Sequence, residues 1–281
     1  MCPGRAYQYA SAMTRLERIS ETFDRMHPSG LLYSTYESRL VAELDRERMP
    51  KHVAVLADGN RRWARMNAPD QPLVAGYQAG ADKLKDFVGW CEEAGIQVVT
   101  LWVLSTDNLS RSESDELAPL LDVIQQLVVE LAADGRWRVQ AMGDMGLLPP
   151  AMAEALEGAK HRTAGVKGML VNVAIAYGGR HELRDAVRSL MREEAARGTT
   201  LAELAETMET DQISEHLYTR GQPDPDLIIR TSGEQRLSGF LMWQSAHSEF
   251  WFCEALWPDF RKVDFIRALR AYADRERRFG G

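Results

Sequence analysis

The chain is short of cysteine, of lysine and of long apolar runs. Its 281 residues include three cysteines, which are odd in number and scattered along the sequence. This pattern fits neither a disulfide framework nor the ligand spacing of a metal site, and it predicts a reduced, cytoplasmic protein. No apolar run reaches the length of a membrane-spanning helix, and the first residues lack the apolar region of a signal peptide.

Basic side chains are outnumbered as well. The 34 basic and 41 acidic residues give a formal net charge of −7 at pH 7. Because sequence-independent binding to nucleic acid depends on neutralising phosphates, we expect no nucleic-acid partner. Only 6 of the basic residues are lysines and 28 are arginines. Codon bias and a need for planar, two-pronged contacts to phosphate or carboxylate explain this excess equally well.

Apolar runs that alternate with helical patterns predict the fold. The predicted strands are residues 52–57, 97–104, 137–142, 169–176 and 227–230, with a further strand at 240–243. The predicted helices are residues 31–46, 84–91, 117–131, 181–196 and 263–277. Such alternation indicates one α/β domain with a mostly parallel sheet covered by helices on both faces. We expect this domain to span residues 31–281, after a mobile extension at residues 1–30.

Residues that directly follow a strand are the candidates for function, because ligands bind outside the carboxyl ends of parallel strands. Residues 58–63 (DGNRRW) follow the first strand. Gly59 allows close approach of the backbone to a ligand, and Arg61 and Arg62 add positive charge. Asp58 is open to two interpretations, an N-cap of the next helix or a ligand of a divalent cation that bridges to phosphate.

Two further loops have the same position. Residues 105–108 (STDN) follow the second strand and are typical of helix caps as well as of substrate-binding loops. In residues 227–238 (LIIRTSGEQRLS), Arg230 and Arg236 flank small hydroxyl and glycine residues, an arrangement that would hold a diphosphate. Glu249 lies beside the aromatic residues 250–252 and should be paired or metal-bound. Together these loops predict a magnesium-dependent transfer between hydrophobic substrates that carry diphosphates.

Six segments together resemble the cis-prenyltransferase family, in particular its actinobacterial short-chain (Z)-farnesyl diphosphate synthases. The resemblance runs in order over about residues 50–281, and the segment RTSGEQRLS is highly specific. The segments are 52–63 (HVAVLADGNRRW), 105–108 (STDN), 172–180 (NVAIAYGGR), 225–238 (PDLIIRTSGEQRLS), 243–245 (WQS) and 248–250 (SEF).

The resemblance implies a homodimer whose parallel sheet encloses an elongated hydrophobic tunnel. It implies that Asp58 is essential and holds Mg²⁺, to which Glu249 contributes. The positions that match the allylic diphosphate site are Gly59, Asn60, Arg61, Arg62 and Arg111. Those that match the isopentenyl diphosphate site are Arg230, Arg236 and Ser238. The candidate substrate-binding set is completed by Trp63, Ser105, Thr106, Asp107 and Leu237.

Two more positions acquire roles from the resemblance. Asn108 matches a position with a part in the chemical step, and since a neutral amide is a poor base we expect it to orient the substrate while a diphosphate oxygen takes the proton. Arg278 and Gly280 match a C-terminal RxG motif that reaches across the dimer to the second diphosphate. Leu109 and Tyr77 depart from the family pattern, which often has Trp and His there.

The length of the product is the remaining expectation. Val103 lies two residues before Ser105, so it should point into the tunnel, and its β-branched side chain should narrow that tunnel. We therefore expect a short product of the (Z,E)-farnesyl type, and a lipid product would bring the protein near membranes. The alternatives are a long-chain polyprenyl diphosphate synthase, irregular coupling of the lavandulyl type, and a non-catalytic partner subunit.

Overall fold

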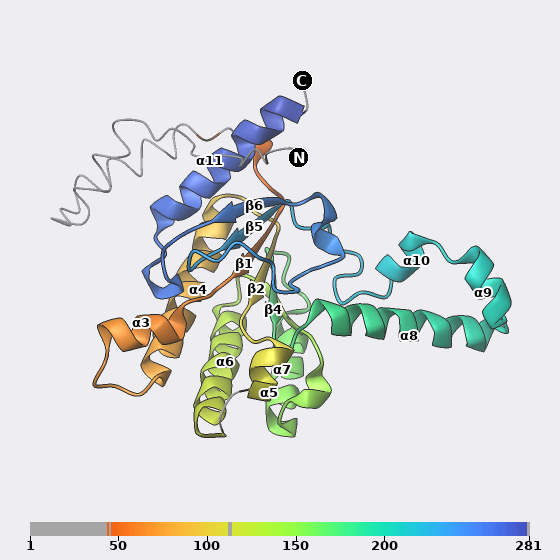
Figure 1. Ribbon diagram of the computed structural model, residues 1–281, viewed down its shortest axis with the longest axis horizontal. Coiled ribbons are helices and arrows are strands. Elements are labelled where there is room, and N and C mark those ends of the chain that lie inside the picture. Colours follow the sequence, from red (N-terminus) through yellow and green to blue (C-terminus); the bar gives the residue numbers. More distant parts are fainter. Residues whose placement is uncertain (1–43, 45, 112–113, 280–281) are drawn as a thin grey trace, which may run out of the picture. The chain divides into compact units, whose positions relative to one another are not determined.

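Six parallel strands form the centre of the structure, a computed structural model that describes residues 44, 46–111 and 114–279 (Figure 1). Their order across the sheet is β3-β4-β2-β1-β5-β6, so β1 lies inside the sheet. Each strand pairs with its neighbours in parallel. The strands are β1 (His52–Leu56), β2 (Val98–Trp102), β3 (Arg138–Met142), β4 (Leu170–Ala174), β5 (Leu227–Arg230) and β6 (Glu249–Phe252).

Helices connect the strands, as parallel pairing requires. Contacts in the shared core place α4, α6, α7 and α11 on one face of the sheet, whereas α8 runs away from the sheet (Figure 1). The α-helices are α3 (Asn60–Asn67), α4 (Val74–Glu93), α5 (Thr106–Arg111), α6 (Ser114–Asp134), α7 (Pro150–Thr163), α8 (Gly179–Arg197), α9 (Leu201–Thr207), α10 (Thr210–Ser214) and α11 (Lys262–Phe279). The 3₁₀ helices are η1 (Arg46–Arg48), η2 (Met145–Leu147), η3 (Gln244–His247) and η4 (Trp257–Asp259). No helix in the described part of the chain is long and apolar enough to cross a bilayer.

Most of the sequence prediction is confirmed. Five predicted strands correspond to β1–β5, and the sheet is parallel with helical connections. The predicted strand at residues 240–243 is wrong, because Leu241 has a positive φ of 44° and these residues form turns. The sixth strand is instead β6, and α7 was not predicted. The expected extension at residues 1–30 and most of the helix at 31–46 lie outside the described residues.

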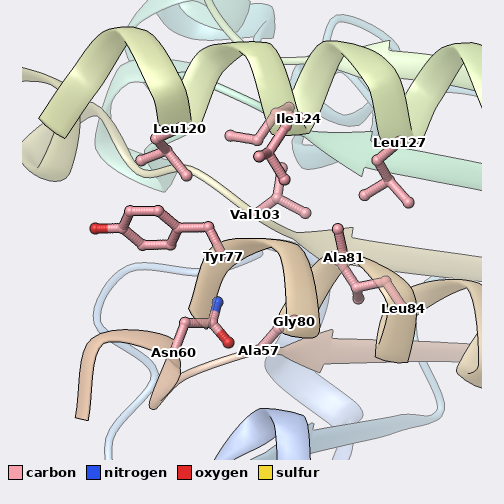
Figure 2. A pocket seen from close by; sticks show the side chains of 11 residues that line it. Ala57, Asn60, Tyr77, Gly80, Ala81, Leu84, Val103, Leu120, Ile124 and Leu127 are labelled. Atoms are coloured by element: carbon pink, nitrogen blue, oxygen red, sulfur yellow. The ribbon is translucent and has the colours of Figure 1, made fainter. Parts of the chain in front are cut away.

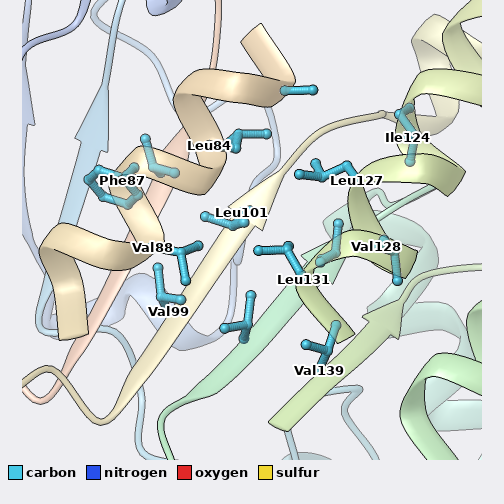
Figure 3. Packing of buried hydrophobic residues seen from close by; sticks show 14 of the residues in the cluster. Leu84, Phe87, Val88, Val99, Leu101, Ile124, Leu127, Val128, Leu131 and Val139 are labelled. Carbon is cyan, nitrogen blue, oxygen red and sulfur yellow. The ribbon is translucent and has the colours of Figure 1, made fainter. Parts of the chain in front are cut away.

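The main core lies between the sheet and α4, α6, α7 and α11. Alternate strand residues, such as Val99 and Leu101 on β2, point into it and are fully buried (Figure 3). Phe87 on α4 packs edge-on against Trp257, with 5.6 Å between ring centroids. A smaller core on the other face contains Tyr177 and Phe240. Burial on both faces explains why the strands read as continuous apolar runs.

Polar side chains cross the second face of the sheet in a buried row. His52 Nδ1 lies 2.8 Å from the carbonyl oxygen of Pro223, and its Nε2 lies 2.8 Å from Thr100 Oγ1. Asn172 Nδ2 donates to Thr100 Oγ1 at 3.0 Å and to Gln222 Oε1 at 2.7 Å. These contacts are satisfied when Nδ1 carries the imidazole proton and Nε2 accepts the threonine hydroxyl, so His52 fits the row as a neutral ring.

Stability should therefore fall as the pH falls below 6.5. Burial lowers the pKa of His52 below its ordinary value of 6.5, so the unfolded chain takes up a proton at a pH where the folded chain does not. The loss for one such group is at most about 1.4 kcal/mol per pH unit. Urea unfolding between pH 7.5 and 5 measures it, and His52→Asn should flatten the dependence. Equal slopes for the variant and the unaltered protein would contradict this assignment.

Candidate active site

The carboxyl edge of the sheet gathers the candidate residues from three strands. Leu56 at the end of β1 pairs with Arg230 on β5 and with Trp102 on β2. The loops after these strands, which contain Asp58, residues 231–238 and residues 105–108, therefore begin at the same level of the sheet. The structure therefore brings the three candidate loops together at the carboxyl edge of the sheet.

Asp58 is held by the loop that follows β5. Its Oδ2 accepts a hydrogen bond from Ser232 Oγ at 2.9 Å and lies 3.4 Å from Arg230 Nη2. Its backbone N–H donates to Thr231 Oγ1 at 3.1 Å, and the same hydroxyl donates to the Asp58 carbonyl at 2.8 Å. The side chain remains 45% exposed. The N-cap of α3 is Gly59, without a side-chain cap, so the capping interpretation of Asp58 is wrong.

The N-terminus of α3 begins beside this carboxylate. Gly59 has φ 117°, and a Cβ there would meet Leu256 at 3.0 Å, so both the backbone conformation and the close packing require glycine. The first turn of α3 contains no acidic residue, and Arg61 and Arg62 are exposed on it. Arg62 Nη2 lies 3.4 Å from the Ser232 carbonyl. This helix end can bind an anion through its N–H groups and the adjacent guanidinium groups.

Arg230 is the buried cation of the site, with 4% of its surface exposed. Its Nη1 donates to Ser238 Oγ at 2.9 Å and to the Arg236 carbonyl, which ties the end of β5 to the far side of the loop. Burial lowers the pKa of Arg230, and the ion pair with Asp58 acts in the opposite direction. Arg236 is exposed and pairs with Glu234, while Leu237 packs on the smaller core. The loop therefore presents Arg236 and Ser238 around a buried, rigid guanidinium.

Glu249 does not lie with Asp58 within one chain. It is the first residue of β6 and pairs with Leu227, the first residue of β5, so it lies about 10 Å along the strands from the carboxyl edge. Its carboxylate pairs with Arg275 of α11. The resemblance assigns Asp58 and Glu249 to one metal site, and the structure does not bring them together within one chain. In the described residues no group of three or more His, Cys, Asp or Glu could hold a metal ion.

The loop after β2 behaves in part as a helix cap. Ser105 Oγ accepts a hydrogen bond from the backbone N–H of Asn108 at 2.9 Å, at the start of α5. Thr106 Oγ1 lies 3.4 Å from His181 Nδ1, and the side chains of Asp107 and Asn108 are exposed. Ser105 thus fits the capping interpretation, while Asn108 is accessible at the carboxyl edge.

Three candidates cannot be placed. The side chains of Arg111 and Arg278 lie outside the described part of the chain, and so does Gly280. Their roles remain expectations from the sequence. The Gly-rich segment 176–180 forms the turn from β4 into α8, with Gly178 as its N-cap.

A pocket between α4 and α6 opens beside this edge. Figure 2 shows Asn60 and Tyr77 at one end and Leu84 and Leu127 at the other, with Val103 pointing into the space between the helices. The lining is formed by Ala57, Asn60, Tyr77, Gly80, Ala81, Leu84, Val103, Leu120, Val123, Ile124 and Leu127. Leu84 and Leu127 also belong to the closely packed main core (Figure 3). The pocket is thus polar beside α3 and apolar at its inner end.

Glycine allows α3 to approach the pocket wall closely. A Cβ at Gly80 would lie 2.5 Å from Asn60 Oδ1, and one at Gly76 would lie 2.3 Å from the Asn60 carbonyl. This contact directs Asn60 toward the pocket, where its Oδ1 is buried without a hydrogen-bond partner. Asn60, which forms the polar end of the pocket, is therefore only two residues after Asp58 in the chain.

Sequence reasoning missed the residues that support the site. Buried Glu182 accepts hydrogen bonds from the Tyr177 hydroxyl and from Gln244 Nε2, and burial raises its pKa. The Tyr177 hydroxyl in turn accepts the backbone N–H of Leu241. This network fixes the chain just after the Arg236–Ser238 loop. Glu182 lies on the buried side of α8, and its apolar neighbours in the helix pattern are the only sequence signal that could have predicted its burial.

Trp63, a candidate substrate-binding residue, contacts a distant segment of the chain. Its indole N–H donates to Asp259 Oδ1 at 2.7 Å, so this group is engaged with the protein itself. Asp259 lies in η4, 196 residues further along the chain, and nothing in the sequence between them signals the contact.

Comparisons with known proteins identify similar sequences. Residues 56–280 match the family described as "Putative undecaprenyl diphosphate synthase". A (2Z,6E)-farnesyl diphosphate synthase of Thermobifida fusca is 58% identical over 249 residues, covering 89% of this chain and 97% of the relative. A short-chain Z-isoprenyl diphosphate synthase of Mycobacterium bovis is 52% identical over 252 residues, covering 89% and 95%.

A solved structure shares the fold. Lavandulyl diphosphate synthase from Lavandula x intermedia, in complex with dimethylallyl diphosphate, superposes with a TM-score of 0.73 at 32% identity, covering 81% of this chain and 96% of the other. Since the family match spans most of the chain and the relatives are similar over nearly their whole length, the chain belongs to the undecaprenyl diphosphate synthase family of cis-prenyltransferases.

Proposed function

We propose that the protein condenses isopentenyl diphosphate with a short allylic diphosphate to give a short-chain (Z)-prenyl diphosphate such as (Z,E)-farnesyl diphosphate. One observation carries the proposal. An anion-binding edge built from Asp58, the start of α3 and the Arg230 loop lies at the polar end of an apolar pocket. A substrate with a diphosphate head and a hydrocarbon tail matches both parts.

The two diphosphates would occupy different parts of this edge. The allylic diphosphate fits the N-terminus of α3 with Arg61 and Arg62, since its tail can then enter the pocket past Asn60. Isopentenyl diphosphate fits the loop that presents Arg236 and Ser238 around Arg230. The Arg230 Nε is buried without an acceptor, which suits a charged ligand at this loop.

The residues present fit a magnesium ion. Mg²⁺ in proteins is usually held by one or two carboxylates together with substrate phosphates and water, and Asp58 is one half-exposed carboxylate beside two anion sites. When bound there, the ion would neutralise charge on the departing diphosphate. Ser232 and Arg230 keep the Asp58 carboxylate oriented for this role.

The chain's own groups would support the bond changes. The C–O bond to the allylic diphosphate breaks, the double bond of isopentenyl diphosphate attacks the allylic carbon, and a proton then leaves. The N–H groups of α3 and the arginines stabilise the negative charge of the leaving diphosphate. Asn108, exposed at the same edge, would orient the second substrate, and a diphosphate oxygen would take the proton.

The inner end of the pocket supports a short product. Leu84 and Leu127 continue into the packed core, where extra carbons cannot be absorbed without displacing side chains. Val103 narrows the space between α4 and α6 before that end (Figure 2).

Val103→Ala should lengthen the product by one or more isoprene units, because it removes the two methyl groups that narrow the pocket. Product chromatography after incubation with excess isopentenyl diphosphate measures the length. Val139→Ala is the control, since it removes the same two methyl groups from a fully buried valine of β3 that does not line the pocket. An unchanged product from the Val103 variant would remove the basis for this assignment.

A homodimer is part of the proposal. Arg278 and Gly280 match a motif that reaches across the dimer in the family, and Glu249 lies too far from Asp58 to share a metal with it inside one chain. If Glu249 serves a metal site, that site belongs to a second copy. Sedimentation at assay concentrations measures the oligomeric state.

One assay tests the function itself. The protein is incubated with Mg²⁺, isopentenyl diphosphate and a labelled dimethylallyl, geranyl or farnesyl diphosphate, and the products are identified. A linear Z-prenyl diphosphate of short length is expected. A branched skeleton would instead indicate irregular coupling, a long polyprenyl chain would indicate a long-chain synthase, and no product with any primer would indicate a non-catalytic partner subunit.

A further inference from the structure

Residues 256–260, which we call the strap, pack against the loop between β1 and α3. The backbone N–H of Trp257 donates to the Asp58 carbonyl at 2.9 Å, and Leu256 packs against Gly59. The indole N–H of Trp257 donates to the Gly80 carbonyl on α4 at 2.9 Å. The strap thus contacts the carboxylate loop and the pocket wall at once.

The strap itself is immobilised by the core. Trp257 and Phe260 are both fully buried, stack with 5.4 Å between ring centroids, and pack edge-on against Phe87. A rigid segment of this kind can fix the position of a less tightly packed element that contacts it.

Helix α3 is such an element. It has eight residues, and Ala64 is its buried residue, packed where Gly76 of α4 leaves room. Asn60, one turn before Ala64, packs against Gly76 and Gly80 of α4, so these contacts hold one face of the short helix. The hydrogen bond from Trp63 Nε1 to Asp259 Oδ1, at 2.7 Å, is a second anchor that joins α3 to the strap.

We infer that Trp63 and Asp259 form a positioning pair for the allylic diphosphate site. The pair fixes the direction of the N–H groups at residues 60–62, while the indole N–H is not offered to the substrate. The Arg230 loop has its own support in Ser238 and the Arg236 carbonyl, so the isopentenyl site should not depend on the pair. The inference rests on the proposed function and names residues that determine one of its two substrate sites.

Three variants test it. Trp63→Phe keeps an aromatic ring without the donor, Asp259→Ala removes the acceptor, and Asp259→Asn keeps a neutral acceptor oxygen. We expect the first two to raise KM for the allylic substrate about tenfold, because a slightly misdirected anion site binds less well. KM for isopentenyl diphosphate should stay within about twofold, and Asp259→Asn should recover most of the loss.

The double variant shows whether Trp63 and Asp259 act through one shared hydrogen bond or through two independent effects. Trp63→Phe with Asp259→Ala should be no worse than either single variant, because both remove the same hydrogen bond. Glu206→Ala, at an exposed position of α9, is the control for surface substitution. Urea unfolding of each variant verifies that the fold is retained, and calorimetric titration with inorganic diphosphate provides a readout without turnover.

The outcomes are distinguishable. If the unaltered protein makes no prenyl product, the proposed function fails. If it is active but the variants leave the allylic KM unchanged, raise both KM values equally, or combine multiplicatively, the positioning pair is wrong while the function stands.

Discussion

Asp58→Asn should lower kcat by about two to three orders of magnitude while leaving the protein folded. Asparagine has the same shape, and its amide oxygen can still accept the hydrogen bond from Ser232. It lacks the charge that a magnesium ion and the Arg230 guanidinium require, so both the metal and the orientation of the leaving diphosphate are lost. Steady-state rates at saturating substrate and varied Mg²⁺ measure the effect.

The control for Asp58→Asn is the same substitution at Asp211, an exposed residue of α10. That variant should retain full activity and the same melting temperature. Because Asp58 is 45% exposed, its replacement should change stability little. A kcat for Asp58→Asn within tenfold of the unaltered protein would show that this carboxylate does not hold the catalytic metal.

Arg230→Met should lower kcat/KM for isopentenyl diphosphate by about a hundredfold, with little loss of stability. The side chain is 4% exposed, so its contacts with substrate would form in a largely dry setting where charge-assisted hydrogen bonds are strong. The same burial lowers the pKa of Arg230 and makes its charge costly to the free protein. Methionine fills a similar volume without that cost.

Arg192→Met provides the matched control, since Arg192 is exposed on α8. Kinetics with isopentenyl diphosphate as the varied substrate and urea unfolding of both variants complete the experiment. A full-activity Arg230→Met protein would overturn the placement of the second diphosphate. If Arg230→Met is unfolded without urea, the guanidinium is required for the stability of the fold.

The sequence predicted the sheet well because each strand is buried on both faces and reads as an apolar run. It failed at residues 240–243, where Phe240 and Leu241 are buried by turns that pack on the sheet instead of by a strand. It also missed β6, whose residues are only partly buried at the sheet edge. The position of Glu249 at the start of this strand, away from the carboxyl edge, was therefore not predicted.

The site was predictable to the extent that it lies at strand ends. Asp58 and the Arg230 loop were found in this way, although they are 172 residues apart in the chain. The partners that fix them were not, since the contacts of Ser232 with Asp58 and of Trp63 with Asp259 depend on packing between distant segments. Local patterns carry no signal for such pairs.

The most direct measurement is a crystal structure of the protein with Mg²⁺, isopentenyl diphosphate and an unreactive thiolo analogue of the allylic diphosphate. We predict one diphosphate at the N-terminus of α3 with its tail between α4 and α6, the other against Arg230, Arg236 and Ser238, and the metal on Asp58. Diphosphates bound away from this edge, or a tail outside the pocket that Val103 lines, would contradict the account.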